Sequence, residues 1–510
     1  MAQTQLKTVM ADTPSGKVRG TCSEGVEIYR GIPYGEAERF MPPAAKTPWT
    51  GVHDGTVNGT RAPQGGGSIF SAPGIGAYFS GGRADGPAQT EQADSEDCLV
   101  LNVLTTGTAG RRPVMVYIHG GGYTGGSGAL TLLSDRFVRE QDVVLVGVNH
   151  RLNVLGYVYL GADDPRYRIG NAGQLDLVLA LEWVRANIAA FGGDPDNVTL
   201  FGESGGGGKI STLLGMPAAR GLFKRVIIES GSIMHSPSVA DHSEIVSQLL
   251  EALGLAAGQS AELAKITPEE IFKAMTNLPT QSRRPSVMMH MGPVVDGITL
   301  PEQPWEPAAS PCAAGVPMLV GCCKDEGTLF CAGNPKVYRL DWPGLQQALE
   351  EDALSSAEAA HVVDYYRSTY QQESASDLFF RIRTDRTMRQ AVRRQARLKI
   401  VQGDAVWMYH FCWNVPDKAG RLRAFHTAEL PLAMRLVAHP EAEGLSRQLA
   451  ASWASFARSG DPNNTETPKW PSYTDDARVT MMFDSTSAAV ANPDGAMLDY
   501  LSERRSEALL

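Results

Sequence analysis

The sequence lacks a long apolar run, and this absence excludes several classes of protein at once. No stretch approaches the roughly 20 apolar residues that a membrane-spanning helix needs. Residues Met1–Thr8 contain no apolar segment of the kind found in secretory signal peptides. Lysine and arginine form no run, and the formal net charge is −10. We therefore expect a chain with neither a nucleic-acid partner nor a membrane partner.

Cysteine is scarce, and its spacing does not suit metal binding. The chain has seven cysteines, an odd number that cannot all pair as disulfides within the chain. Without an export signal we expect reduced thiols and a cytoplasmic location. Cys322, Cys323 and Cys331 are close in sequence, but no CxxC spacing and no neighbouring histidine accompany them. We therefore expect no metal site. The composition, 43% hydrophobic and 20% charged, is that of an ordinary globular protein.

Apolar runs alternate with a helical pattern along much of the chain. The spacing of apolar residues predicts a helix from Gln174 to Phe191, and continuous apolar runs predict buried parallel strands. The order strand, helix, strand predicts an α/β fold, with a mostly parallel twisted sheet and helices on both faces. The predicted strands are Leu99–Leu104, Pro113–Ile118, Asp142–Asn149, Asn197–Gly202, Val226–Ile228, Val316–Gly321 and Ala405–Phe411.

The remaining segments complete one predicted domain, residues 1–510, without internal repeats. An antiparallel hairpin is expected within residues 16–34, and helical cap insertions are expected at about 237–285 and 343–398. A glycine- and proline-rich loop covers about Phe40 to Gly86. The aromatic residues of this loop either fold over a site entrance or pack beneath the loop itself; they are Phe70, Tyr78 and Phe79.

A strand, a Gly-x-Ser-x-Gly turn and a helix follow one another around Ser204. This order is that of a nucleophile elbow, in which the serine adopts a strained backbone conformation at a sharp turn. Gly202 and Gly206 flank the serine, and we expect them to be required because a Cβ atom there would collide with the neighbouring strand and helix. The motif therefore predicts a serine hydroxyl that is presented above the edge of the sheet.

A second glycine motif, His119-Gly120-Gly121-Gly122, directly follows a predicted buried strand. Backbone N–H groups can approach a developing oxyanion closely only where side chains are absent. The motif is therefore typical of an oxyanion hole, whereas a flexible hinge is the alternative. We expect His119 to position this loop.

An activated serine needs a base, and the base needs an orienting carboxylate. In the order that this fold favours, Ser204 is followed by Asp325 or Glu326 and then by His426. The residues alone do not select among the ten histidines. His410 lies within a predicted strand and fits the core, whereas His235 and His290 are alternative pocket residues.

These motifs together resemble the type-B carboxylesterase family, in its cholinesterase and para-nitrobenzyl esterase branch. The resemblance covers nearly the whole chain and implies the α/β-hydrolase fold. The segments that carry it are Ser95–Leu99, His119–Tyr123, Phe191–Pro195, Phe201–Gly206, Lys324–Gly327 and His426–Glu429.

The resemblance implies a serine esterase without a cofactor, acting on small-molecule esters of small to medium size. Ser204 would be the nucleophile, His426 the base and Glu326, rather than Asp325, the orienting acid. Ser230 would join the hydrogen bonds around that acid. The oxyanion would bind to backbone N–H groups of Gly121, Gly122 and Gly205. Candidate pocket residues are Glu203, His119, Met234, Met289 and Met291, and ordinary core packing is the alternative for Met289 and Met291.

The chain departs from the family pattern at two positions. Ala62-Pro63-Gln64 stands where a cysteine partner of Cys98 would be expected, so we expect a free thiol at Cys98. Gly205 replaces the commoner alanine, which we expect to loosen the turn slightly. An amidase, a carbamate hydrolase and a lipase would use the same triad, and a non-catalytic binding protein could share the fold.

Overall fold

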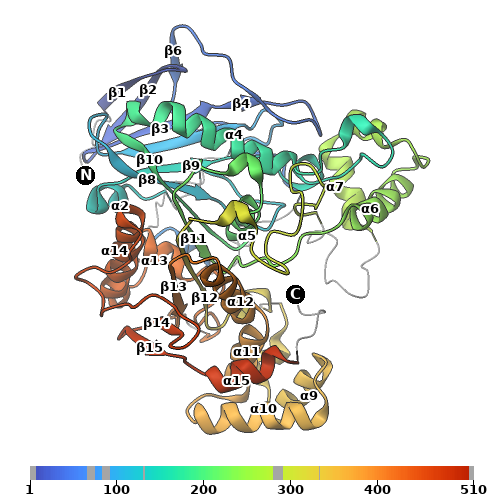
Figure 1. Ribbon diagram of the computed structural model, residues 1–510, viewed down its shortest axis with the longest axis vertical. Helices are drawn as coiled ribbons and strands as arrows, with labels where there is room; N and C mark the ends of the chain where they lie inside the picture. The colour runs from blue at the N-terminus through green and yellow to red at the C-terminus, as the bar shows by residue number, and fades with distance from the viewer. Residues whose placement is uncertain are drawn as a thin grey trace.

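One large sheet forms the centre of the molecule (Figure 1). The computed structural model describes residues 7–65, 75–82, 92–129, 133–278, 291–331, 333–417 and 419–504. The sheet has 13 strands in the order β1-β2-β3-β7-β9-β8-β10-β11-β12-β13-β14-β15, with β6 paired to β2. The strands of its parallel centre are β9 (Val144–Val148), β8 (Arg112–Ile118), β10 (Gly193–Glu203), β11 (Arg225–Glu229), β12 (Met318–Cys323), β13 (Val406–Phe411) and β14 (Val479–Phe483).

The two ends of the sheet are antiparallel, except that β6 pairs with β2 in parallel. The predicted hairpin is present as β2 and β3, preceded by β1, and β7 joins this end to the parallel centre. At the other end β15 pairs with β14. A separate two-stranded sheet pairs β4 with β5. The bounds of these strands are β1 Lys7–Thr13, β2 Gly16–Ser23, β3 Val26–Pro33, β4 Gly35–Glu36, β5 Ala44–Ala45, β6 Val52–Asp54, β7 Val100–Thr105 and β15 Ala488–Ala491.

Helices cover both faces of the sheet, because side chains along each central strand alternate between two separate cores. In β8, Val114 and Val116 belong to one hydrophobic cluster, and Met115 and Tyr117 belong to the other. The first cluster contains α4, α5 and α12; the second contains α2, α13 and α14. These helices are α4 Ala172–Asn187, α5 Gly205–Leu213, α12 Met388–Val401, α2 Asp135–Gln141, α13 Glu429–Ala433 and α14 Glu443–Ser459.

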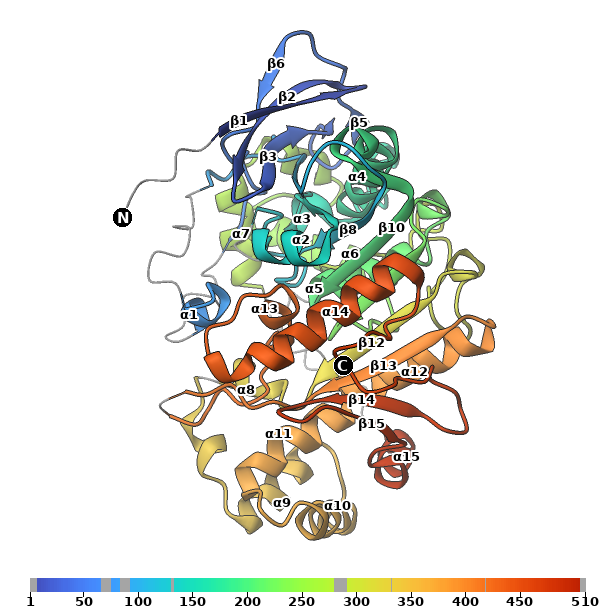
Figure 2. The same ribbon diagram turned by 90° about the vertical axis from the view of Figure 1, so that its left-hand side faces the viewer.

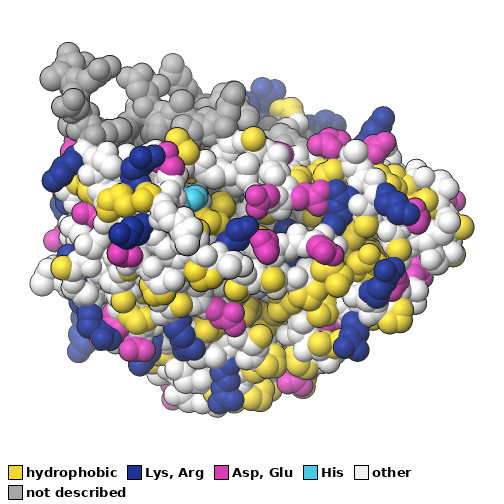
Figure 3. All heavy atoms as spheres, turned by 90° about the horizontal axis from the view of Figure 1, so that it is seen from above, with side chains coloured by type: hydrophobic (Ala, Val, Ile, Leu, Met, Phe, Trp, Pro, Cys, Tyr) yellow, Lys and Arg dark blue, Asp and Glu magenta, His cyan; other side chains and the backbone are white. Residues whose placement is uncertain are grey.

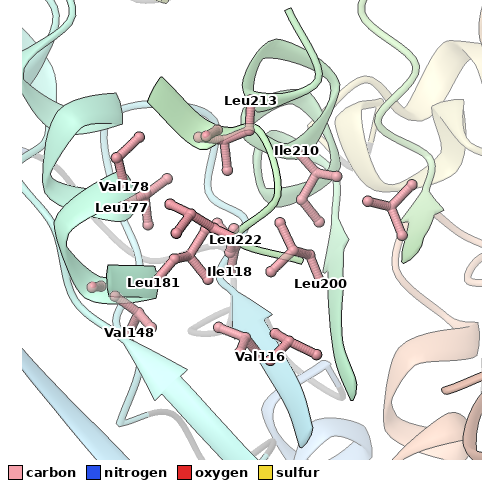
Figure 4. Packing of buried hydrophobic residues seen from close by; sticks show 14 of the residues in the cluster. Val116, Ile118, Val148, Leu177, Val178, Leu181, Leu200, Ile210, Leu213 and Leu222 are labelled. Carbon is pink, nitrogen blue, oxygen red and sulfur yellow. The ribbon is translucent and has the colours of Figure 1, made fainter. Parts of the chain in front are cut away.

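The core beneath the candidate site is formed by α4, α5 and the strands that they cover (Figure 4). Ile210 and Leu213 of α5 point toward Leu200 of β10 and toward the apolar side chains of α4. These side chains are almost fully buried, so their removal from water anchors the helix that follows Ser204.

The two predicted helical insertions are helical, and they lie in different parts of the molecule (Figures 1 and 2). The first comprises α6 (Val239–Ala252) and α7 (Pro268–Thr276), and the second comprises α9 (Trp342–Glu351), α10 (Ser356–Thr369) and α11 (Ala375–Arg386). Serine or threonine caps α6, α7, α10 and α11, each with an acidic residue three positions later that completes a capping box. The segment 343–398 was expected to be an insertion throughout, but α12 packs on β12 and β13 as part of the main fold.

Four further helices are short or lie near the C-terminus. They are α1 (Ile75–Phe79), α3 (Asn153–Gly156), α8 (Gly327–Phe330) and α15 (Gly495–Ser502). None of the helices in the described ranges is long and apolar enough to cross a membrane. On the face that Figure 3 shows, acidic and basic side chains are interspersed.

Candidate active site

Ser204 lies at a sharp turn between β10 and α5. Its backbone angles are φ 55° and ψ −124°, which only a strained turn imposes on a residue with a side chain. A Cβ atom on Gly206 would lie 2.0 Å from the carbonyl oxygen of Ile118, and one on Gly202 would lie 2.6 Å from the same oxygen. Both flanking glycines are therefore required, as the motif predicted.

Glu326, rather than Asp325, pairs with His426. Glu326 follows β12, and its Oε2 accepts a hydrogen bond from Nδ1 of His426. Its Oε1 accepts hydrogen bonds from Ser230 Oγ (2.6 Å) and from the backbone N–H of Cys323 (2.8 Å). Three donors therefore fix the carboxylate and, through it, the orientation of the imidazole.

Asp325 faces away from the histidine. Its Oδ2 lies 3.5 Å from Lys324 Nζ and accepts a 3.4 Å hydrogen bond from the backbone N–H of Ala424. Its own backbone N–H donates to the carbonyl of Ala424 at 2.9 Å. Asp325 thus holds the loop that leads to His426 without contacting the imidazole.

The other ring nitrogen of His426 lies close to a second carboxyl group. His426 Nε2 lies 3.2 Å from Oε1 of Glu203, and both side chains are buried. Burial lowers the pKa of His426, but Glu203 and Glu326 outweigh this effect and raise the pKa to about 9. Burial raises the pKa of Glu203, and the charge of His426 opposes that rise.

The structure does not join the serine to the histidine directly. None of the hydrogen bonds among the described residues links Ser204 Oγ to His426 Nε2, because this nitrogen faces Glu203. Such bonds are often long before substrate is bound and tighten in the reacting complex. Ser204 and His426 nevertheless both follow central strands of one sheet, and Glu203, which contacts the imidazole, directly precedes the serine.

The glycine loop after β8 presents unused N–H groups. Gly121 and Gly122 have φ angles of 84° and 62°, which favour glycine. The carbonyl of Gly121 accepts from the N–H groups of Thr124 (3.2 Å) and Gly125 (3.1 Å). None of the hydrogen bonds within the described ranges uses the N–H of Gly121 or Gly122. With Gly205, the first residue of α5, these groups can bind an anionic oxygen.

Gly205 does not loosen the turn, contrary to the expectation from the sequence. A Cβ atom at this position would lie 2.1 Å from the carbonyl oxygen of Gly122. The loop that contains Gly121 and Gly122 therefore packs directly against the start of α5, and glycine is required by this close approach.

His119 positions the loop from below. Its ring is buried, its Nδ1 lies 3.0 Å from the carbonyl oxygen of Gly120, and it packs against the ring of His150 with centroids 4.6 Å apart. Burial and, secondarily, Lys209 lower the pKa of His119 to about 3. The ring is therefore neutral, and its 1% exposure argues against a pocket role.

The predicted pocket methionines lie in the core where the structure describes them. Met234 belongs to the cluster that contains α4 and α5, and Met291 belongs to the cluster of α6 and α7. Met289 lies outside the described residues, as does His290. A pocket role for Met289 stays a prediction, whereas Met234 and Met291 fit the alternative of ordinary core packing.

His410 and His235 are not part of the constellation around Ser204. His410 is buried in β13 with its Nδ1 near the carbonyl oxygen of Cys322, which agrees with the core interpretation. His235 is paired with Glu306. All seven cysteines are free, and Cys98 is a buried thiol as expected.

Two neighbours of the site were missed in the sequence. The ring of Phe330 lies 4.9 Å from that of His426 and is 66% exposed. Its position, four residues after Glu326 at the end of α8, could have indicated a place beside the base. Lys209 of α5 donates to the carbonyl groups of His119 and Gly122. A lysine among small and apolar residues was the available signal.

Two aromatic residues of the early loop, Tyr78 and Phe79, are buried. Tyr78 of α1 is buried, donates a 2.6 Å hydrogen bond to the carbonyl of Ala428 and packs against Phe425. Phe79 is also buried, and Phe70 lies outside the described residues. Tyr78 therefore packs against the segment that carries His426, and the burial of both side chains argues against a place over an open site entrance.

Comparisons with known proteins agree with one another over almost the whole chain. The model of the carboxylesterase family matches residues 7–498. A para-nitrobenzyl esterase of Bacillus subtilis (strain 168) is 34% identical over 515 residues, covering 97% of this chain and 99% of that protein. A phenmedipham hydrolase of Pseudarthrobacter oxydans is 30% identical over 523 residues, covering 97% and 99%.

Solved structures show the same relationship in three dimensions. A carboxylesterase of Geobacillus stearothermophilus, determined at pH 6.2, superposes with a TM-score of 0.80 at 32% identity, covering 96% of this chain and 99% of that chain. A para-nitrobenzyl esterase structure gives a TM-score of 0.78 at 31% identity, covering 96% and 99%. The fold is therefore the α/β-hydrolase fold, and the chain belongs to the carboxylesterase family as a carboxylic ester hydrolase.

Proposed function

We propose that the chain hydrolyses small to medium apolar esters through an acyl-enzyme on Ser204, with His426 as base and Glu326 as orienting acid. The observation that carries this proposal is the contact between Glu326 and Nδ1 of His426, which leaves Nε2 as the nitrogen that can accept the serine proton. Since the carboxylate is fixed by Ser230 and Cys323, the imidazole keeps this tautomer.

The reaction then proceeds in two steps. Ser204 Oγ attacks the ester carbonyl carbon while its proton passes to His426 Nε2. The oxygen of the tetrahedral intermediate binds to the N–H groups of Gly121, Gly122 and Gly205. The imidazolium returns the proton to the leaving alcohol, and a water molecule activated by His426 releases the acid in the second step.

The surroundings of the histidine support an apolar substrate. The exposed ring of Phe330 beside His426 offers an apolar surface at the reacting centre. The free thiols, among them Cys98, fit a reducing compartment, so we also propose a cytoplasmic location.

The first experiment compares wild type with Ser204→Ala on para-nitrophenyl esters of increasing acyl length. We expect turnover that falls by about 10⁵-fold or more in the variant, and an optimum acyl length that measures the pocket. Full activity in Ser204→Ala would contradict the proposal. Faster turnover of a para-nitroanilide than of the matching ester would point to an amidase, and activation at an oil–water interface would point to a lipase.

A matched pair of variants tests the choice of acid. Glu326→Gln should lower kcat by about 10⁴-fold because the imidazole loses its orienting charge. Asp325→Asn should lower thermal stability while kcat stays near wild type, because Asp325 contacts the loop and not the ring. Equal losses of kcat in the two variants would contradict the assignment.

A further inference from the structure

Lys209 is a fully buried amine, and no carboxylate among the described residues forms an ion pair with it. It lies on α5, in the helix that follows Ser204, and its side chain is completely inaccessible to solvent. Burial lowers its pKa to about 7. Burying an amine without a counter-ion is unfavourable, so its polar contacts must compensate for the lost water.

Those contacts are with the two ends of the oxyanion loop. Lys209 Nζ donates to the carbonyl oxygen of His119 at 3.0 Å and to that of Gly122 at 2.9 Å. These two carbonyls belong to the peptide groups immediately before and after the two that carry the N–H groups of Gly121 and Gly122. The lysine therefore holds both sides of the donor pair.

The groups that face the amine are neutral. The His119 and His150 rings have pKa values lowered chiefly by burial and further by Lys209, so neither carries a charge at neutral pH. The Tyr123 ring lies 5.6 Å from Nζ, with its face available to a cation. Among the described residues, the charge of the amine therefore meets the dipoles of two carbonyl groups and the face of an aromatic ring.

We propose that Lys209 is a positioning residue of the oxyanion hole: it ties the loop His119–Gly122 to the helix after Ser204, so that the N–H groups of Gly121 and Gly122 face the tetrahedral oxygen. The proposal rests on the function proposed above. Because these N–H groups act on the charge that develops during the reaction, their alignment matters more for the transition state than for the bound ester.

Lys209→Met tests this role, because methionine fills a similar volume and donates no hydrogen bond. Ser211→Ala is the matched control: Ser211 is buried two residues further along α5, but its hydroxyl bonds to Gly231 and Gln395 instead of the loop. The measurements are kcat and KM for para-nitrophenyl acetate and the inhibition constant of an alkyl trifluoromethyl ketone. The serine oxygen adds to the carbonyl carbon of that ketone, and the serine proton passes to His426. The product is a tetrahedral adduct whose former carbonyl oxygen is an oxyanion.

We expect Lys209→Met to lower kcat by about 10²-fold, as for loss of an oxyanion-hole donor, with KM changed only a few-fold. The inhibition constant of the ketone should rise by the same factor as kcat/KM falls. Ser211→Ala should leave both ratios near wild type. Lys209→Gln, which keeps N–H donors without the charge, should lie between wild type and Lys209→Met.

Two outcomes would overturn the proposed role of Lys209. Both can be distinguished from an outcome that overturns the proposed esterase function. One is unchanged ketone affinity in a folded Lys209→Met or Lys209→Gln protein whose kcat has fallen. The other is wild-type kcat/KM in the folded variants while Ser204→Ala is inactive, which removes only the role of the lysine. Retained activity in Ser204→Ala would remove the proposed function and the lysine role together. If Lys209→Met does not fold, the ketone and ester measurements on Lys209→Gln decide.

Discussion

His426 is held between two carboxyl groups, and this arrangement sets how the site responds to pH. Glu326 bonds to Nδ1, and Glu203 lies 3.2 Å from Nε2. A negative neighbour favours the protonated imidazole, which cannot accept the serine proton. In the proposed mechanism, the two carboxyl groups beside the imidazole therefore weaken it as a base at neutral pH.

The pH dependence of kcat/KM should show this effect. Since the pKa of His426 is raised to about 9, activity should climb between pH 7 and pH 9 as the imidazole loses its proton. Glu203→Gln removes one negative neighbour, so the pKa of His426 should fall and the rising limb should move to lower pH. Profiles of kcat/KM for para-nitrophenyl acetate measure both limbs. If the rising limbs of wild type and Glu203→Gln coincide, Glu203 does not influence the pKa of His426.

Gly205→Ala should impair both packing and catalysis. The new Cβ atom would lie 2.1 Å from the carbonyl oxygen of Gly122 and would push the oxyanion loop away from Ser204. We expect kcat to fall by at least about 10-fold and the melting temperature to decrease. Gly444→Ala, near the start of α14 with its nearest atom 4.0 Å away, is the control and should change neither. A fully active Gly205→Ala enzyme would contradict this geometry.

The elements around the site include one that joins two distant segments. Tyr78 of the short helix α1 lies 350 positions before Ala428 in the sequence, yet it bonds to Ala428 and packs on Phe425, on either side of His426. The early loop thus supports the loop that carries the base.

Tyr78→Phe should weaken this support. The buried carbonyl of Ala428 loses a 2.6 Å hydrogen bond, which should cost about 1 kcal/mol of stability, and kcat should fall a few-fold as His426 becomes less well held. Tyr34→Phe removes an equally short bond, to the carbonyl of Asn149. Both variants should show a similar drop in unfolding free energy, but only Tyr78→Phe should lose kcat. Equal kcat values in Tyr78→Phe and Tyr34→Phe would show that the contact of α1 with residue 428 does not affect catalysis.

The sequence predicted those elements whose signal is local. The central strands β8 and β10 read as apolar runs and are present within a few residues of the expected bounds. The strands β14 and β15 were not predicted, because they are only five and four residues long and β15 consists mostly of alanine, which is depleted in strands. Helix α1 was not predicted because its glycine-rich surroundings indicate loop, and its contacts with residues 425–428 lie far along the chain.

The same limit applies to the site. The Gly-x-Ser-x-Gly turn fixed Ser204 because its chemistry is contained in five neighbouring residues. The sequence could not decide whether Asp325 or Glu326 pairs with His426. Adjacent side chains after a strand point in opposite directions, and sequence position alone does not show which of the two faces the imidazole. Lys209 was missed because its acceptors are carbonyl groups of a loop about 90 positions earlier, and backbone acceptors leave no trace in a sequence.

For the molecule as a whole, one buried ion pair connects three parts of the chain. Arg151, after β9, forms a two-pronged pair with Asp176 of α4, with contacts of 2.9 and 2.6 Å. The guanidinium also donates to the carbonyl groups of Glu38 and Met41. The pair therefore fastens the N-terminal segment to the sheet and to the helix behind it. That residues 1–510 form a single domain stays a prediction.

Asp176→Asn should destabilise the whole fold. Removing one partner leaves a buried guanidinium without its counter-charge, and we expect a loss of about 3 kcal/mol in unfolding free energy. Asp54→Asn breaks the exposed pair with Arg19 and should leave stability nearly unchanged. Urea denaturation followed by fluorescence gives both values. Similar midpoints for the two variants would show that the buried pair contributes little.

The close approach of Gly122 to α5 also has a consequence for protein engineering. The carbonyl oxygen of Gly122 accepts a hydrogen bond from Lys209 and occupies the space that a Cβ atom on residue 205 would need. Positions 205 and 209 are therefore coupled through one atom. A Gly-x-Ser-x-Gly turn with alanine after the serine therefore cannot replace residues 202–206 of this protein by itself. Residue 209 and the loop of Gly120–Gly122 must be replaced together with it.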